Sequence, residues 1–275
     1  MGIERHKQDR QDSALVVRQD VGVSARVGQR RDLRFSRIVV DRPALIVVTH
    51  GNKTLHADDR QWSIGSGEAV AIAGGQTFDV SNRLSADGLY EARWLIWDPA
   101  IVAGFDRRPA GIPPLAGAAS LGRVDTQLAG AFERAADAIQ DVEHVPDEVA
   151  RHRLAEVLVW LSLRGIRFAP AEDPGMAMKV RRLFETALDR RWTASIVASD
   201  LAVSEATLRR RLAAEGTGLG AILADVRMSS AMVLLQSTRY PVQRIALEVG
   251  YESASRFAIR FRERFGFPPT AIRRC

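Results

Sequence analysis

The chain has 275 residues, of which 46% are hydrophobic and 26% are charged. These proportions are typical of soluble globular proteins and exclude a disordered, collagen-like or small disulfide-rich chain. The single cysteine, Cys275, cannot form an intrachain disulfide or a thiolate metal site alone, which favours a reducing compartment. The start of the chain lacks the apolar core of a signal peptide, and no apolar run approaches the roughly 20 residues that cross a bilayer. We therefore expect a cytoplasmic protein with no membrane partner.

The net charge of +6 is unevenly distributed along the chain. Residues 1–170 hold 22 Lys and Arg against 22 Asp and Glu, whereas residues 171–275 hold 17 against 11. Because all the excess lies in the last third, we expect that part to meet a polyanion. Only three of the 39 basic residues are lysines, so a coding bias toward arginine also explains the arginine content.

Short β segments rich in valine, isoleucine and aromatic residues fill the first third of the chain. They cover residues 14–23, 33–40, 44–50, 60–64, 68–73, 76–81 and 90–97, with breakers such as HGNK and SADG between them. Closely spaced strands without intervening helices predict a small antiparallel β-barrel or β-sandwich. The aromatic residues of these segments either line a ligand pocket or form ordinary core; they are Trp62, Phe78, Trp94 and Trp97.

Two amphipathic helices are expected next, over residues 124–140 and 146–165. In the second, apolar residues recur at helical spacing at Val149, Leu154, Val157, Leu158 and Leu161. Together the two helices have more apolar surface than one barrel needs. They either form a dimer surface or pack against their own sheet.

A segment rich in proline and acidic residues, FAPAEDPGM at 168–176, is the best candidate for a linker. We therefore predict an α+β protein with an N-terminal domain at 1–168, a linker at 169–175 and an all-α domain at 176–275. The all-α domain is expected to begin with a helix that buries one face, formed by Val180, Leu183, Phe184, Ala187 and Leu188.

The basic third contains an internal repeat. Val197-Ala198 and Ala202-Val203 recur 48 positions later as Ile245-Ala246 and Gly250-Tyr251. At an offset of 49, three further residues recur: Ser204 as Ser253, Leu208 as Phe257 and Leu212 as Phe261. Each copy predicts a short helix, a tight turn at a small residue, an N-capping serine and a second helix. This is the helix-turn-helix pattern, present twice.

The second helix of each copy exposes arginines. In the first copy the outward residues are Ala206, Thr207, Arg209, Arg210 and Arg211; in the second they are Ser255, Arg256, Arg260 and Arg264. Arginine neutralises phosphates and reads guanine edges in the major groove. A solvated arginine face is the plain alternative for each residue, but the repetition of both motif and arginines favours DNA binding.

Between the copies, residues 219–238 predict one helix of about 20 residues, hence about 30 Å long. A rod of that length can hold two recognition helices near the 34 Å repeat of successive major grooves. One chain would then read two adjacent grooves without a dimer.

These features resemble the AraC family of bacterial transcription regulators. The match is carried by VASDLAVSEATLRRRLAAEGTGL, by the spacing of Arg227, Ala231, Leu234 and Leu235, and by IALEVGYESASRFAIRFRERFGFPP. It covers about residues 176–273. The stretches LRRRLAAEGT and GYESAS look most like the branch that contains acid-resistance and virulence regulators of enteric bacteria.

The resemblance implies a sequence-specific activator of transcription that binds double-stranded promoter DNA, works with RNA polymerase and associates with the nucleoid. Base contacts carried over by position are Ala206, Arg209, Arg210, Ser255, Arg256 and Ala258. At Ile259 the family usually has a basic residue, so Arg256 and Arg260 are expected to bind phosphates and the second helix to read bases less stringently. The first 168 residues are similar in order and length to a cupin-like domain that dimerises and binds a small-molecule effector.

No catalytic, metal or cofactor site is predicted. His50 and His56 are six residues apart, with Glu68 later, whereas cupin enzymes resemble one another in a closely spaced His-x-His pair. Two alternatives remain: a cupin-type metalloenzyme with an appended DNA-binding domain, and a DNA-organising protein without sequence preference.

Overall fold

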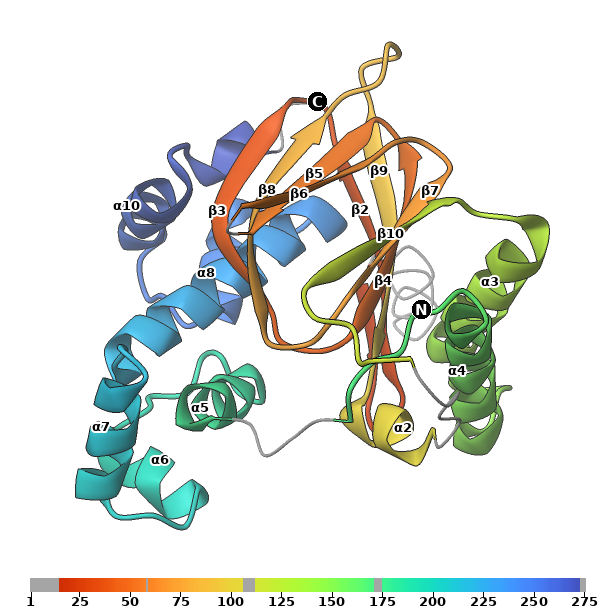
Figure 1. The fold of residues 1–275 in the computed structure, drawn as a ribbon. Helices are drawn as coiled ribbons and strands as arrows, with labels where there is room; N and C mark the ends of the chain where they lie inside the picture. The colour runs from red at the N-terminus through yellow and green to blue at the C-terminus, as the bar shows by residue number, and fades with distance from the viewer. Residues whose placement is uncertain (1–14, 58, 106–111, 171–174, 273–275) are drawn as a thin grey trace. The chain divides into compact units, whose positions relative to one another are not determined.

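The computed structural model describes residues 15–57, 59–105, 112–170 and 175–272. The chain forms two compact units, Met1–Ala171 and Glu172–Arg274 (Figure 1). The first residues of the chain, most of the predicted linker at 169–175 and Cys275 lie outside the described residues.

The first unit is built on antiparallel strands in two sheets. One sheet has the order β1-β2-β9-β4-β7-β10, with bounds Leu15–Arg18, Gly22–Gln29, Tyr90–Trp97, Ala44–His50, Glu68–Ile72 and Ala118–Arg123. The other has the order β3-β8-β5-β6, with bounds Leu33–Val40, Gln76–Arg83, Asn52–Ala57 and Arg60–Ile64. The predicted antiparallel β architecture is confirmed.

Some predicted strand bounds were wrong. The segment 14–23 is interrupted by a turn at 19–21, where Asp20 has a left-handed φ of 56°, so that β2 starts only at Gly22. Strand β5 was missed because it follows the turn residue Gly51 directly, inside the predicted breaker HGNK. Strand β10 was missed because it lies between two helices in the chain and its register shifts between Ser120 and Gly122.

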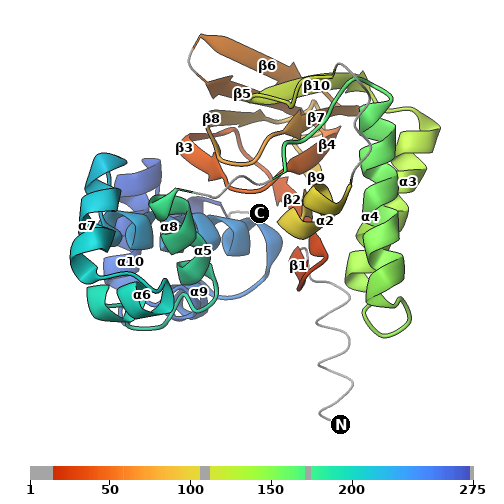
Figure 2. The ribbon, with the colours of Figure 1, turned by 60° about the horizontal axis from the view of Figure 1, so that its bottom comes forward.

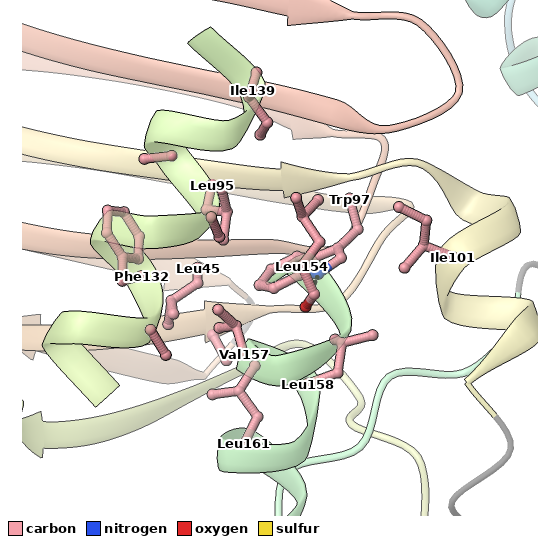
Figure 3. Packing of buried hydrophobic residues seen from close by; sticks show 14 of the residues in the cluster. Leu45, Leu95, Trp97, Ile101, Phe132, Ile139, Leu154, Val157, Leu158 and Leu161 are labelled. Carbon is pink, nitrogen blue, oxygen red and sulfur yellow. Dashed lines mark hydrogen bonds between the residues drawn. The ribbon is translucent and has the colours of Figure 1, made fainter. Parts of the chain in front are cut away.

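Helices α2 (Pro99–Gly104), α3 (Thr126–Gln140) and α4 (Asp147–Ser162) pack on the outer face of the six-stranded sheet (Figure 2). Figure 3 shows Leu95 and Trp97 of the sheet packed against Phe132 and Leu154 of the helices. The Trp97 indole donates a 3.1 Å hydrogen bond to the Leu154 carbonyl. The two predicted helices therefore pack against their own sheet.

The prediction that Val149 belongs to the buried face of α4 was wrong. The residue surface of Val149 is 41% exposed, whereas the other four positions are buried. At 3.6 residues per turn, Val149 lies to one side of the stripe that touches the sheet.

Helices are the regular elements of the second unit over the described residues 175–272. Its helices are α5 (Met176–Glu185), α6 (Ala194–Asp200), α7 (Glu205–Ala214), α8 (Leu219–Ser237), α9 (Val242–Glu248) and α10 (Ala254–Phe265), and a 3-10 turn follows at Pro269–Ala271. The prediction that one helix continues through Ala187 and Leu188 was wrong. Helix α5 ends at Glu185, and the Thr186 hydroxyl donates to the Leu183 carbonyl in the last turn.

Helix α8 corrects the expectation that no segment is apolar enough to span a bilayer. Residues Leu219–Gln236 have a mean hydropathy of 1.3 over 18 residues. By length and composition alone, this segment is long and apolar enough to cross a membrane. In the structure the helix contacts α5, α9 and α10 and buries Ile222, Val226, Ala231 and Leu235. It is the central core helix of the second unit.

Candidate nucleic-acid interface

The two helix-turn-helix copies share the same turn. Ala202 and Gly250 both have a left-handed backbone, with φ of 52° and 80°. Val203 donates its N–H to the Ala198 carbonyl at 2.9 Å, and Tyr251 donates to the Ala246 carbonyl at 2.8 Å. This pattern ends the first helix of each copy and directs the chain into the second.

Each second helix begins at the predicted serine. The Ser204 hydroxyl accepts from the Thr207 N–H at 3.1 Å, and the Ser253 hydroxyl accepts from the Arg256 N–H at 3.4 Å. These caps satisfy amide groups that have no partner within the helix. The turns and caps together fix the direction in which α7 and α10 project.

Helix α7 buries Leu208 and Leu212 and leaves its opposite face exposed. Ala206, Arg209, Arg210 and Arg211 are exposed, as the spacing predicted. Thr207 is half-buried, and its hydroxyl accepts a 2.9 Å hydrogen bond from Ser204. Thr207 therefore belongs to the helix cap as well as to the outer surface.

Helix α10 buries a stripe of aromatic rings, Phe257, Phe261 and Phe265. Adjacent rings in this stripe lie 5.6 Å and 4.6 Å apart between centroids. The outer side exposes Ser255, Arg256, Ile259 and Arg260, and Ala258 is half-buried at its edge.

Two of the outward arginines are held by carboxylates of their own helix. Arg209 Nη2 lies 3.4 Å from Glu205 Oε2, and Arg260 Nη1 donates to Glu263 Oε2 at 2.9 Å. Exposed pairs of this kind contribute little to stability, so a phosphate can replace the carboxylate. No ion pair is found for Arg210, Arg211 or Arg256 in the part of the chain that the structure describes.

Arg264 was predicted to face outward, and this was wrong. Its side chain is 20% exposed, and its guanidinium lies 3.1 Å from Asp225 of α8. Asp225 also accepts from Arg181 of α5 at 2.5 Å. The carboxylate is 39 residues from Arg264 along the chain, so the sequence pattern gave no sign of the pair.

Arg227, in the middle of α8, connects the loop after α5 to the turn of the second copy. It donates to the Leu188 carbonyl at 3.0 Å and to the Arg190 carbonyl at 3.3 Å. Its guanidinium also lies 5.8 Å from the centre of the Tyr251 ring. Burial lowers the pKa of Arg227 and raises the pKa of Tyr251. Helix α8 thereby links the loop after α5 to the second turn and helps to set the spacing of α7 and α10.

The first unit contains a buried lysine that the sequence analysis did not single out. Lys53 is 2% exposed, and its ammonium donates to Asn82 Oδ1 at 2.8 Å. The ammonium lies 5.5 Å from the Tyr90 ring centre and 5.4 Å from the Trp94 ring centre. The Tyr90 hydroxyl and the Trp94 indole N–H are both buried, and neither has a hydrogen-bond partner among the residues that the structure describes. Burial lowers the pKa of Lys53 to about 7.

His50 and His56 lie on different strands, β4 and β5. In the strand register His50 is opposite Glu91 of β9, and His56 is opposite Gln61 of β6 and Asp79 of β8. Among the described residues, no group of three His, Cys, Asp or Glu residues is placed to hold a metal ion.

The fold is similar over nearly the whole chain to that of ToxT from Vibrio cholerae. A crystal structure of wild-type ToxT with a bound unsaturated fatty acid aligns with a TM-score of 0.62 and 12% identity, covering 92% of this chain and 96% of ToxT. A structure of apo ToxT carrying K231A aligns with a TM-score of 0.63 and 13% identity, covering 91% and 96%.

Residues 197–274 match a family model described as a helix-turn-helix domain. The Escherichia coli transcriptional activator CfaD is 41% identical over 91 residues, which are 33% of this chain and 34% of CfaD. The Escherichia coli K12 regulator GadX is 31% identical over 98 residues, 36% of each chain. The match thus spans about a third of the length of these relatives. These similarities confirm the resemblance to AraC-type regulators that the repeat predicted, and they show a helix-turn-helix domain at residues 197–274.

Proposed function

We propose that the chain is a transcription regulator, mainly an activator, that binds asymmetric promoter sites through α7 and α10. The proposal rests on one observation: two matching helix-turn-helix motifs, fixed by the same turn and cap, present exposed arginines on their second helices. Helix α8 has 19 residues and is therefore about 28 Å long, close to the spacing of successive major grooves. The relatives' names as transcriptional activators support the same function.

Within this proposal the DNA-contacting residues are those predicted from the sequence. Arg210 lies at the centre of the exposed face of α7 and is proposed to read guanine, while the remaining arginines bind phosphates or base edges. The full set is Ala206, Thr207, Arg209, Arg210, Arg211, Ser255, Arg256, Ala258 and Arg260.

We further propose that residues 1–168 form an effector and dimerisation domain and that residues 169–175 connect it to the DNA-binding domain. RNA polymerase and a second copy of the chain are the proposed protein partners, and the nucleoid is the proposed location. The exposed Val142 and Val149 at the α3–α4 hairpin support an interface between two copies.

The effector proposed is a small molecule with a carboxylate. The Lys53 ammonium, which donates to Asn82, lies 5.5 Å and 5.4 Å from the centres of the Tyr90 and Trp94 rings, and the buried Tyr90 hydroxyl and Trp94 indole N–H have no hydrogen-bond partner among the described residues. An anion beside the ammonium would favour the charged form of this buried lysine, and buried donors without a partner favour a ligand that can accept from them. The unsaturated fatty acid and the butenoic acid derivative in the ToxT structures are both acids, which supports this class.

Competition binding tests the DNA-binding proposal. The full chain is used to select duplexes from a random library, and its affinity for a selected duplex is compared with that for random DNA at several salt concentrations. A specificity ratio of about 10³ or more is expected, with affinity that falls as salt rises. Arg210→Ala should lower the affinity for the selected duplex about tenfold or more, whereas Arg60→Ala on the exposed end of β6 should not. Equal affinity for selected and random DNA would overturn the proposal.

Titration with oleate, and with methyl oleate as the uncharged control, tests the effector class. Oleate should raise the melting temperature of the wild-type chain but not that of Lys53→Met, and methyl oleate should raise neither. An equal response of Lys53→Met to oleate would contradict a role for the lysine.

A further inference from the structure

Ile259 is a large apolar side chain in the middle of a DNA-facing helix, and it is 59% exposed. Successive residues of an α-helix are about 100° apart, so Ile259 lies on the side opposite Phe257 and Phe261, which are buried. Ser255 and Glu263 stand one turn to either side of it on the same line. Ile259 is therefore the central residue of the outward face of α10.

Arg210 has the same place on α7. It lies opposite Leu208 and Leu212, which are buried at the positions equivalent to Phe257 and Phe261. The repeat offset of 49 that pairs those core residues also pairs Arg210 with Ile259. The two recognition helices thus have the same geometry but different chemistry at their central position.

The surroundings of Ile259 resemble those of a base-reading position. It lines a surface hollow together with two arginines, Arg256 and Arg260, and two glutamates, Glu252 and Glu263. Both arginines are exposed and can neutralise phosphates on either side of the groove. An isoleucine has no hydrogen-bonding group with which to recognise the polar edge of a base, and it gains free energy only when an apolar group covers it.

One apolar group is displayed in the major groove, the C5-methyl group of thymine. We propose that Ile259 packs against a thymine methyl in the second half-site and selects thymine there. This inference rests on the proposed function, because it requires α10 to enter the major groove. From the sequence alone, α10 was expected to read bases less stringently. The proposed contact instead gives α10 a definite preference for thymine.

The difference between Arg210 and Ile259 also makes the site directional. Arg210 favours guanine in one groove, and Ile259 favours thymine in the next. A single chain would therefore bind in one orientation only, with α7 toward the guanine half-site and α10 toward the thymine half-site.

Uracil substitution tests the methyl contact on the selected duplexes. Replacing thymine by deoxyuridine removes the methyl and leaves base pairing unchanged. At one thymine of the second half-site the substitution should weaken binding of the full chain about fourfold, the effect of exposing one methyl-sized group. Two further duplexes carry a cytosine–guanine pair in place of that thymine–adenine pair. The chain should bind the duplex with 5-methylcytosine more tightly than the duplex with unmethylated cytosine, by a similar factor.

Two variants assign the effect to the side chain. The Ile259→Ala variant should bind the thymine and uracil duplexes equally. The two changes, removal of the isoleucine side chain and removal of the thymine methyl, form a double-mutant cycle that measures the contact between them. Leu247→Ala is the matched control: Leu247 is 61% exposed on α9 of the same motif, and its removal should leave the uracil effect unchanged. Ile259→Arg should shift the preferred base from thymine to guanine.

Different results would exclude the Ile259–thymine contact and the DNA-binding function. If specific duplexes are selected but uracil weakens binding at no position, the Ile259 inference is wrong and the DNA-binding function stands. If Ile259→Ala instead lowers transcription without changing DNA affinity, the residue contacts a protein and the inference is equally wrong. If no sequence is selected, the proposed function and the inference fail together.

Discussion

Ala202 and Gly250 occupy the same left-handed turn in two motifs 48 residues apart, yet one is alanine and the other glycine. The surroundings explain the glycine. A Cβ at position 250 would lie 2.5 Å from the Leu188 carbonyl oxygen and 2.5 Å from Arg227 Nη2. Arg227 and the loop after α5 thus approach the second turn too closely for any side chain.

Ala202→Gly should stabilise the second unit by about 0.5–1 kcal/mol, because glycine relieves the left-handed strain of alanine at the cost of some chain entropy. Gly250→Ala should destabilise it by about 2 kcal/mol or more, because the added methyl overlaps backbone and guanidinium atoms. Hydrogen exchange of the α6–α10 amides in the full chain measures both changes. Shifts of equal size and the same sign would contradict the different packing of the two turns.

Asp225 of α8 connects α5 and α10, because it pairs with an arginine of each helix. Asp225→Asn removes the negative charge that pairs with both Arg181 and Arg264 and should destabilise the unit by about 2 kcal/mol. The exposed pair of Asp200 and Arg190, at 3.4 Å, provides a control. Asp200→Asn should cost less than about 1 kcal/mol in the same exchange measurement. Equal costs would mean that the Asp225 pairs do not hold the unit together.

Lys53 predicts an unusual pH dependence of stability. Its pKa is about 7 in the folded chain and about 10.4 in the unfolded chain. Between these values the unfolded chain binds more protons, so the free energy of unfolding rises with pH by up to about 1.4 kcal/mol per pH unit. The penalty for burying this lysine is thus full below pH 7 and disappears above pH 10.

Lys53→Met should therefore be more stable than the wild-type chain at pH 7, and the difference should shrink as the pH rises toward 10. Urea unfolding followed by tryptophan fluorescence reports mainly the first unit, because only Trp192 lies in the second. Lys179→Met on α5 should keep the wild-type slope. Parallel pH profiles for wild type and Lys53→Met would show that the lysine does not titrate in this range.

The helical unit could be predicted closely because its signals are local. The capping serines, the small turn residues and the four-residue spacing of Leu208–Leu212 and Phe257–Phe261 each act within one or two helical turns. The repeat doubled each signal. The outward placement of Arg209, Arg210 and Arg256 followed directly from that spacing.

The features that the sequence did not predict depend on residues far apart in the chain. Arg264 points inward because it pairs with Asp225 of α8. Lys53 is buried because Tyr90 and Trp94 of the facing sheet cover it. Lysine is almost never buried, so no pattern within β5 could indicate it. Strand β10 depends on pairing with β7, about 50 residues earlier, rather than on its own composition.

Guanine methylation interference on a selected duplex tests directly whether one chain reads two adjacent major grooves. With the full chain at concentrations where one copy binds each duplex, interfering positions should fall in two clusters about 10 base pairs apart on one face of the DNA. Arg210→Ala should remove interference from one cluster only. A single cluster, or interference spread evenly along the duplex, would contradict the placement of α7 and α10 in neighbouring grooves.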